Sequence, residues 1–119
     1  MRGAGLNDER SFSERLFGSR YRLELLAAFA SAPDGRVNLG VLADSKGVSA
    51  AVYYPAIRDL LAMRLAVRIE QLTRDRRRWY ARSGDDLVWE GLSAMISGLQ
   101  RHFDQMVGPV PAAASGTRR

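Results

Sequence analysis

The sequence predicts a mainly α-helical domain that carries one small β-hairpin. Three stretches of the 119 residues predict this fold class. Two apolar segments joined by a glycine turn occupy residues 39–65, and apolar and charged residues alternate on both sides of an arginine run at residues 74–78. A stripe of apolar residues at helical spacing then fills residues 85–106. This order of a helix, a turn, a helix, a hairpin and a long helix indicates a winged helix-turn-helix.

The N-terminal part is expected to form a flexible end followed by two helices. Residues 1–7 are glycine-rich and expected to be mobile, and residues 8–17 are predicted to form a short helix. Ser19 is expected to cap a second helix that runs to Ala30 and is apolar almost all round. A helix of this kind usually packs between its own core on one side and a partner surface on the other.

A turn and a short strand then lead into the glycine-turn segment. After the turn residues 32–35, a strand is expected at residues 36 and 37, Asn38 caps the next helix, Gly47 permits a sharp turn and Ser49 caps the helix that follows. The core face of that last helix is predicted to be Tyr53, Ala56, Ile57 and Leu60. Its opposite face carries small side chains, one exposed aromatic ring and one cation, as a helix that enters a DNA groove requires. These expected DNA contacts are Ser49, Ala50, Ala51, Tyr54, Pro55 and Arg58.

The same residues resemble winged helix-turn-helix regulators. The second helix of PadR-like regulators is similar to Val48-Ser49, Tyr54-Pro55-Ala56-Ile57, Leu60 and Leu65. The opening helix of ArsR-like winged helices is similar to Leu16-Phe17-Gly18-Ser19-Arg20 with Leu23, Leu25 and Leu26. The chain departs from the PadR-like pattern where Arg64 replaces a glycine, Lys46 a buried aliphatic residue and Arg82 a leucine.

The hairpin is predicted from strands at residues 66–73 and 79–82, with its tip between them. The tip is rich in cations: Arg74, Arg76, Arg77 and Arg78. Beside a helix that reads DNA, these arginines are expected to bind phosphates or a minor groove, and Lys46 is expected to add a contact. The alternative is a solvated tip whose charge serves solubility, since Asp75 dilutes it.

The last predicted helix has more apolar surface than one small domain needs. Ser83 and Asp86 resemble a capping box at its start, and Gly108-Pro109 ends it. One side is expected to cover the core and the other to join two copies of the chain. The expected dimer contacts are Tyr21, Trp89, Leu92, Met95, Ile96, Leu99 and Phe103. The alternative is a monomer in which residues 12–17 fold over the surplus face.

Composition agrees with one basic globular domain over residues 8–107 and a disordered tail at 108–119. The net charge is +5 and 46% of residues are hydrophobic, which suits a folded protein with a polyanionic partner. The absence of cysteine excludes disulfides, thiolate metal sites and the cysteine-based metal sensing that the ArsR resemblance suggests. No metal or cofactor is expected. Without a signal peptide or a long apolar run, the expected location is the cytoplasm.

Enzymatic functions are disfavoured. His102 is the single histidine and has no recognisable catalytic neighbour, and Asp85 and Asp86 are adjacent, so their side chains point apart on a helix. The predicted function is therefore a homodimeric, sequence-specific transcriptional regulator that binds duplex DNA. Two alternatives stay open. One is a winged-helix interaction module whose basic wing binds an acidic protein, and the other a ligand-responsive regulator with an apolar pocket near Tyr21, Trp89 and Met95.

Overall fold

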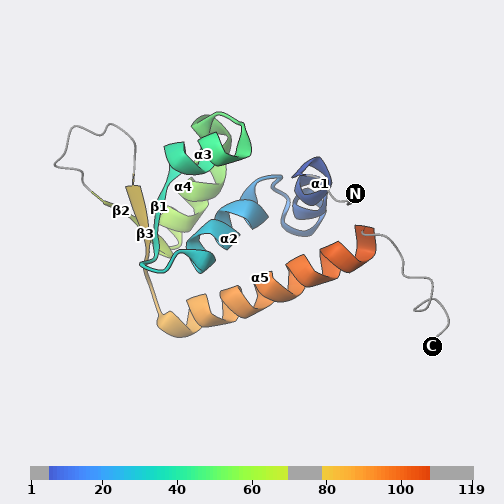
Figure 1. The fold of residues 1–119 in the computed structure, drawn as a ribbon. Coiled ribbons are helices and arrows are strands. Elements are labelled where there is room, and N and C mark those ends of the chain that lie inside the picture. Colours follow the sequence, from blue (N-terminus) through green and yellow to red (C-terminus); the bar gives the residue numbers. More distant parts are fainter. Residues whose placement is uncertain (1–5, 70–78, 108–119) are drawn as a thin grey trace.

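The computed structural model describes residues 6–69 and 79–107, which form a mainly helical domain with a small antiparallel sheet (Figure 1). The elements are α1 (Leu6–Phe17), α2 (Arg22–Ser31), β1 (Arg36–Asn38), α3 (Leu39–Lys46), the 3₁₀ helix η1 (Ala50–Tyr53), α4 (Tyr54–Ala62), β2 (Ala66–Ile69), β3 (Trp79–Arg82) and α5 (Asp86–Val107). The predicted fold class is confirmed at this level: helices dominate, and one small sheet is present.

The sheet has three antiparallel strands in the order β1-β3-β2. Tyr80 of the central strand pairs with Val37 of β1 on one side and with Arg68 of β2 on the other. Val37 and Tyr80 are buried, whereas Arg68 on the edge strand is exposed. The short strand predicted at residues 36 and 37 is thus the third member of the sheet. The predicted tip, residues 74–78, lies outside the described residues, as do residues 1–5 and 108–119.

Helix α2 lies at the centre of the molecule and contacts α1, α4, β1 and α5. Its buried apolar residues are Leu23, Leu25, Leu26 and Phe29. Figure 1 shows α5 running along one side of the molecule, past α2 and toward α1. Helix α2 therefore packs on more than one side against elements of its own chain, and the partner surface expected from the sequence stays a prediction. Across the two described ranges, none of the helices combines the length and the apolarity that crossing a bilayer needs.

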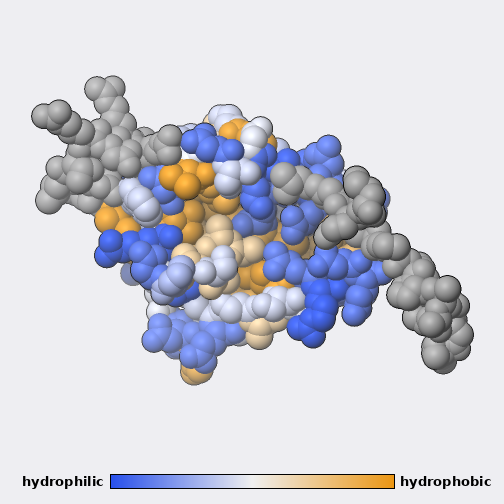
Figure 2. Space-filling view, viewed as in Figure 1, coloured by the Kyte–Doolittle hydropathy of each residue, from blue (hydrophilic) through white to orange (hydrophobic). Residues whose placement is uncertain are grey.

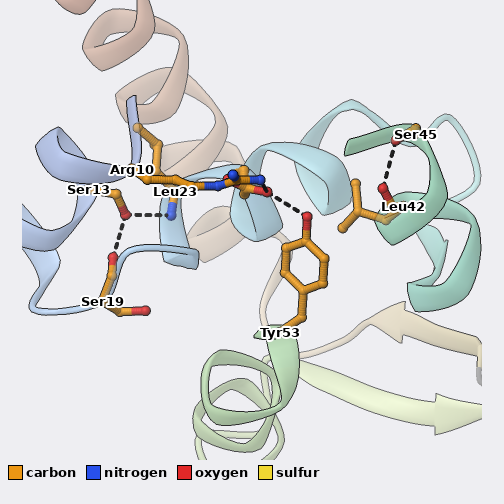
Figure 3. Close-up of polar contacts among 8 residues, drawn as sticks. Arg10, Ser13, Ser19, Leu23, Leu42, Ser45 and Tyr53 are labelled. Atoms are coloured by element: carbon orange, nitrogen blue, oxygen red, sulfur yellow. Dashed lines mark hydrogen bonds and ion pairs between the residues drawn. The ribbon is translucent and has the colours of Figure 1, made fainter. Parts of the chain in front are cut away.

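The start of α2 differs from the prediction. Ser19 does not cap this helix: Tyr21 occupies the cap position and makes no capping hydrogen bond with its side chain. Ser13 of α1 provides the acceptor instead, because its Oγ receives the backbone N–H of Leu23 at 3.0 Å and donates to the carbonyl of Ser19 at 2.6 Å (Figure 3). A buried serine on a neighbouring helix thus satisfies an amide that the local sequence leaves without a partner.

The predicted capping box at the start of α5 is also wrong. The Ser83 hydroxyl donates to the carbonyl of Arg64 at 2.9 Å, so it holds the turn between α4 and β2. Asp85 caps α5 through Oδ1, which accepts the N–H of Leu87 at 2.8 Å. The side chain of Ser83 therefore bonds to a residue distant in the sequence, and Asp85 caps α5 in its place.

Candidate nucleic-acid interface

In the segment from α3 to α4 the three turn residues have their predicted roles, but the single helix predicted from Ser49 is divided into the 3₁₀ helix η1 and α4. The Asn38 side chain accepts the N–H of Val41 at 3.0 Å and caps α3. Gly47 ends α3 with φ 71°, a left-handed conformation that a residue with a side chain adopts only at a cost. The Ser49 hydroxyl then accepts the N–H of Ala51 at 3.2 Å, so it caps the short η1 that precedes α4.

The predicted core face of η1 and α4 is confirmed. Tyr53 is completely buried, and each of the other three core residues is only 2% exposed: Ala56, Ile57 and Leu60. Pro55 at the start of α4 suits this position, because the first turn of a helix needs no hydrogen bond from its backbone nitrogen. One side of the segment is therefore fixed in the core, which determines the side left exposed.

Most of the expected DNA contacts lie together on that exposed side. The exposed members are Ser49, Ala51, Tyr54, Pro55 and Arg58, and Ala50 is half-buried. Tyr54 is 40% exposed, so its ring is available for contact. Small side chains next to one aromatic ring and one guanidinium group leave α4 free to approach a surface closely and to donate hydrogen bonds from Arg58.

The negative charge on α4 is neutralised from outside the helix. Arg58 and Asp59 are the charged residues of η1 and α4. The Asp59 carboxylate accepts a hydrogen bond from Arg22 at the start of α2 and forms an ion pair with it. Arg58 has no such pairing among the described residues, so the exposed side of α4 carries a net positive charge.

Lys46 lies apart from this face. It lines a hollow of about 400 Å³ that is also lined by Glu9 of α1 and Gln100 of α5. Two other exposed cations lie on the outer strands of the sheet, Arg36 on β1 and Arg68 on β2. The predicted wing contacts Arg74, Arg76, Arg77 and Arg78 are outside the described residues.

A buried polar cluster lies behind η1, and sequence reasoning missed it. The Glu24 carboxylate of α2 accepts hydrogen bonds from Arg10 Nε at 2.8 Å, from Arg10 Nη2 at 3.2 Å and from Tyr53 Oη at 2.5 Å. Figure 3 shows Arg10 of α1 and Tyr53 converging from opposite sides. The guanidinium carbon of Arg10 also lies 4.8 Å from the ring centre of Tyr21. A glutamate within the apolar run of residues 23–30 was the available signal.

The cluster shifts the ionisation of two of its members. Burial, followed by the hydrogen bond to Glu24, raises the pKa of Tyr53 well above its usual range. The hydrogen bond to Glu24 raises the pKa of Arg10. Glu24 is 4% exposed and Arg10 is 6% exposed, so a charged pair lies almost completely out of water. Such a pair requires both partners, because removing one leaves a buried charge.

The expected dimer contacts divide between the interior and the surface. Trp89, Ile96 and Phe103 lie in the chain's own core, where they are 6%, 2% and 4% exposed. Tyr21, Leu92 and Leu99 are half-buried, and Met95 is 42% exposed. Phe12 packs on Phe103 with ring centres 5.3 Å apart, so α1 covers part of α5, as the monomeric alternative expected.

The apolar pocket expected near Trp89 does not fit the surroundings of that residue. Its ring lies 5.9 Å from Phe29, and its indole N–H donates to the carbonyls of Leu65 and Ser83 at 3.0 and 2.8 Å. Trp89 therefore joins α5 to the turn before β2. Within residues 6–69 and 79–107, no group of three or more histidine or acidic side chains is placed to hold a metal ion.

An exposed, mostly apolar stripe nevertheless runs along α5, and the exposed His102 lies within it, between Gly98 and Met106. Val88, Met95 and Met106 are 43%, 42% and 55% exposed, and Gly91 and Gly98 fall on the same side of the helix. A Cβ atom added to either glycine would have no neighbour within 4 Å among the described residues, apart from the backbone of α5 itself. Figure 2 shows apolar and pale surface in the middle of the face that α5 crosses, with hydrophilic groups around it.

No protein-family model matches this chain, and no curated protein matches it.

Proposed function

We propose that this chain is a winged helix-turn-helix transcriptional regulator that binds duplex DNA as a homodimer. The observation that carries the proposal is the two-sided character of η1 and α4. One side is fixed by Tyr53, Ile57 and Leu60 in the core, and the other presents small residues with Tyr54 and Arg58. A helix that reads bases needs this arrangement, because bulky neighbours would keep Arg58 from the base edges.

The surroundings of α4 support the same function. A tight glycine turn connects α3 to η1, and the three-stranded sheet follows directly in the chain. Arg22 neutralises Asp59, so the carboxylate next to Arg58 repels a phosphate backbone less than a free one would. The arginine-rich residues 74–78 are predicted from the sequence to supply the wing, with general affinity for phosphates.

The second copy is proposed to bind along the exposed stripe of α5, which is defined by Val88, Gly91, Met95, Gly98 and Met106. Each glycine inside a helix costs about 1 kcal/mol relative to alanine, and none of the described residues occupies the space beside Gly91 or Gly98. Two helices that meet at these glycines could approach closely and cover the methionines. A two-fold contact uses the same stripe on both copies and gives the symmetry of a palindromic operator.

Selection of bound fragments from a pool of random duplexes tests the function. A recurrent sequence is expected, and the fragments obtained then serve for measurements of binding anisotropy. Arg58→Ala should reduce discrimination between the selected and random duplexes by about 1–3 kcal/mol if Arg58 binds a base edge. Arg101→Ala is the matched control, because it removes the same charge from an exposed position near the far end of α5. Binding to heparin as tight as to any DNA, with no sequence selected, would favour the protein-interaction alternative.

The wing is tested by the salt dependence of binding. Alanine at Arg76 and Arg77 should weaken binding to all duplexes and reduce the salt slope by about one unit for each lost phosphate contact. An unchanged slope would remove these arginines from the interface.

The dimer is tested by sedimentation at micromolar concentration. Met95→Glu should dissociate the dimer, because a carboxylate would be buried at the contact. The control is Ser97→Glu, which adds the same charge at an exposed position on the other side of α5, two residues from Met95. A wild-type chain that is monomeric both free and on DNA would overturn this part of the proposal.

A further inference from the structure

We infer that Glu24 is a positioning residue, which fixes the direction in which α4 begins and makes that direction depend on the docking of α1. The inference rests on the proposed DNA-binding function. The buried cluster of Arg10, Glu24 and Tyr53 joins α1, α2 and η1, yet it lies on the side of η1 away from the exposed DNA face. Its role for that face is therefore indirect.

Tyr53 connects the cluster to the DNA face. It is the last residue of η1, and the next residue, Tyr54, begins α4 and is exposed. The Tyr53 ring is held at two points: its hydroxyl donates to Glu24 Oε2 at 2.5 Å, and it meets the Tyr21 ring edge-on at 5.6 Å. With both points fixed and the side chain completely buried, the backbone at residue 53 has little freedom to rotate.

Arg10 links this arrangement to α1. Its guanidinium group donates to both oxygens of the Glu24 carboxylate, and Oε2 also accepts the hydroxyl of Tyr53. If α1 undocked, Glu24 would keep a buried negative charge with the Tyr53 hydroxyl as its remaining partner in the cluster. Water would have to enter to solvate it, and the fixed position of Tyr53 would be lost. The order of α1 is thereby coupled to the order of the first turn of α4.

A purely stabilising role is the competing explanation, and the energetics of buried ion pairs separate the two. Replacing a buried charged pair by apolar residues of similar volume often leaves stability unchanged or higher, while the directional hydrogen bonds are lost. A triple variant, Arg10→Met with Glu24→Leu and Tyr53→Phe, therefore removes the positioning and keeps the packing. If the cluster only stabilises, this variant should behave as the wild type does.

The experiment combines thermal unfolding, amide hydrogen exchange and binding to a mixed-sequence duplex of about 30 base pairs. We expect the triple variant to unfold near the wild-type temperature. Exchange at residues 50–58 should be about tenfold faster and DNA binding about fivefold to tenfold weaker, as loss of a hydrogen bond to a charged group predicts. Unchanged exchange and unchanged affinity in the folded triple variant would overturn the inference.

Two further variants complete the test. Tyr53→Phe keeps the ring and the Arg10–Glu24 pair, so it reports on the hydroxyl alone if the triple variant does not fold. It should speed exchange at residues 50–58, and unchanged exchange there would overturn the inference. Glu14→Gln is the control, because Glu14 forms a surface ion pair with Arg20 at 3.5 Å. If the wild type binds no DNA, the proposed function fails, while hydrogen exchange still decides the role of Glu24.

Discussion

The two ends of α2 are attached to the rest of the fold by different chemistry. At its start, Glu24 bonds to side chains of α1 and η1 in a buried charged cluster. At its end, Phe29 packs on Trp89, and Arg82 of β3 donates to the carbonyls of Phe29 and Ala30 at 2.7 and 3.2 Å. The first attachment is a set of hydrogen bonds among charged and polar side chains, and the second combines ring packing with hydrogen bonds to the backbone.

The difference predicts how each end responds to change. A charged cluster needs all its members, since loss of one leaves another buried without a partner. Contacts to backbone carbonyls and between rings are lost one at a time, each with its own cost. Stability at the start of α2 should therefore depend on pH and on substitutions that change charge. Stability at the end of α2 should depend on substitutions that change side-chain volume.

The largest effect is expected for Trp89→Ala. It removes a large ring from the core and two hydrogen bonds, to the carbonyls of Leu65 and Ser83. The free energy of unfolding should fall by about 3–5 kcal/mol, as measured by denaturant unfolding. Leu87→Ala, at a position 72% exposed on the same helix, should change it by less than about 0.5 kcal/mol.

Protein concentration separates this role from the dimer contact predicted for Trp89 from the sequence. Substitution of a core residue lowers stability equally at all protein concentrations. Substitution of an interface residue changes how stability depends on protein concentration. Loss of that concentration dependence in Trp89→Ala, with little loss of stability in the monomer, would contradict the core assignment.

The second prediction concerns stability at alkaline pH and tests the buried charged cluster at the start of α2. The pKa of Tyr53 is raised above its ordinary value of about 10, so the unfolded chain releases this proton first. The stabilisation is complete below about pH 10 and is lost at higher pH, by up to about 1.4 kcal/mol per pH unit. The unfolding free energies of the wild type and Tyr53→Phe should therefore converge above that pH.

Tyr54→Phe is the matched control for this titration. Tyr54 is the next residue in the chain, and its replacement removes the same hydroxyl from a side chain that is 40% exposed and lies outside the buried cluster. Parallel curves for the wild type and Tyr53→Phe across the alkaline range would show that Tyr53 ionises equally in the folded and unfolded chains.

The third prediction, Arg82→Met, tests the backbone contacts at the end of α2. Methionine keeps much of the apolar stem and removes the donors to the last carbonyls of the helix, which have no partner within the helix itself. Thermal unfolding should show a loss of about 1–2 kcal/mol, smaller than that for Trp89. Arg36→Met, on the neighbouring strand and exposed, should have almost no effect. An equal loss of stability in both variants would show that the loss comes from removing a positive charge and not from the hydrogen bonds of Arg82.

Sequence patterns predicted the parts of this fold that depend on near neighbours. Helical spacing located the core face of α4, and Asn38, Gly47 and Ser49 act at the turn as their residue types suggested. Each of these depends on contacts within a few residues, where one sequence contains the relevant information. The exposed side of α4 followed, because fixing the buried side of a helix determines the other.

The sequence predictions that were wrong concern contacts between segments far apart in the chain. Ser13 replaced Ser19 as the acceptor at the start of α2, and the partners of Glu24 come from positions 14 residues before it and 29 after it. The apolar spacing of α5 identified Trp89 and Met95 alike, yet it could not tell which residue faces the core. Apolar periodicity predicts which residues share a side of a helix. Which of two apolar sides is buried depends on the elements that pack against the helix.

The smallest expected effect is a gain in stability from Arg64→Gly, in the turn that Trp89 contacts. Arg64 has φ 61° and is the one residue other than glycine with positive φ among those described. Its backbone donates to Leu61 and accepts from Ser83, while its side chain is exposed. Glycine adopts this conformation without the contact of Cβ with the backbone, so stability should rise by about 1 kcal/mol. Met63→Gly is the control: Met63 has φ −84°, and glycine there should cost about 1 kcal/mol. Equal losses of stability in the two variants would show that the backbone at Arg64 is not strained.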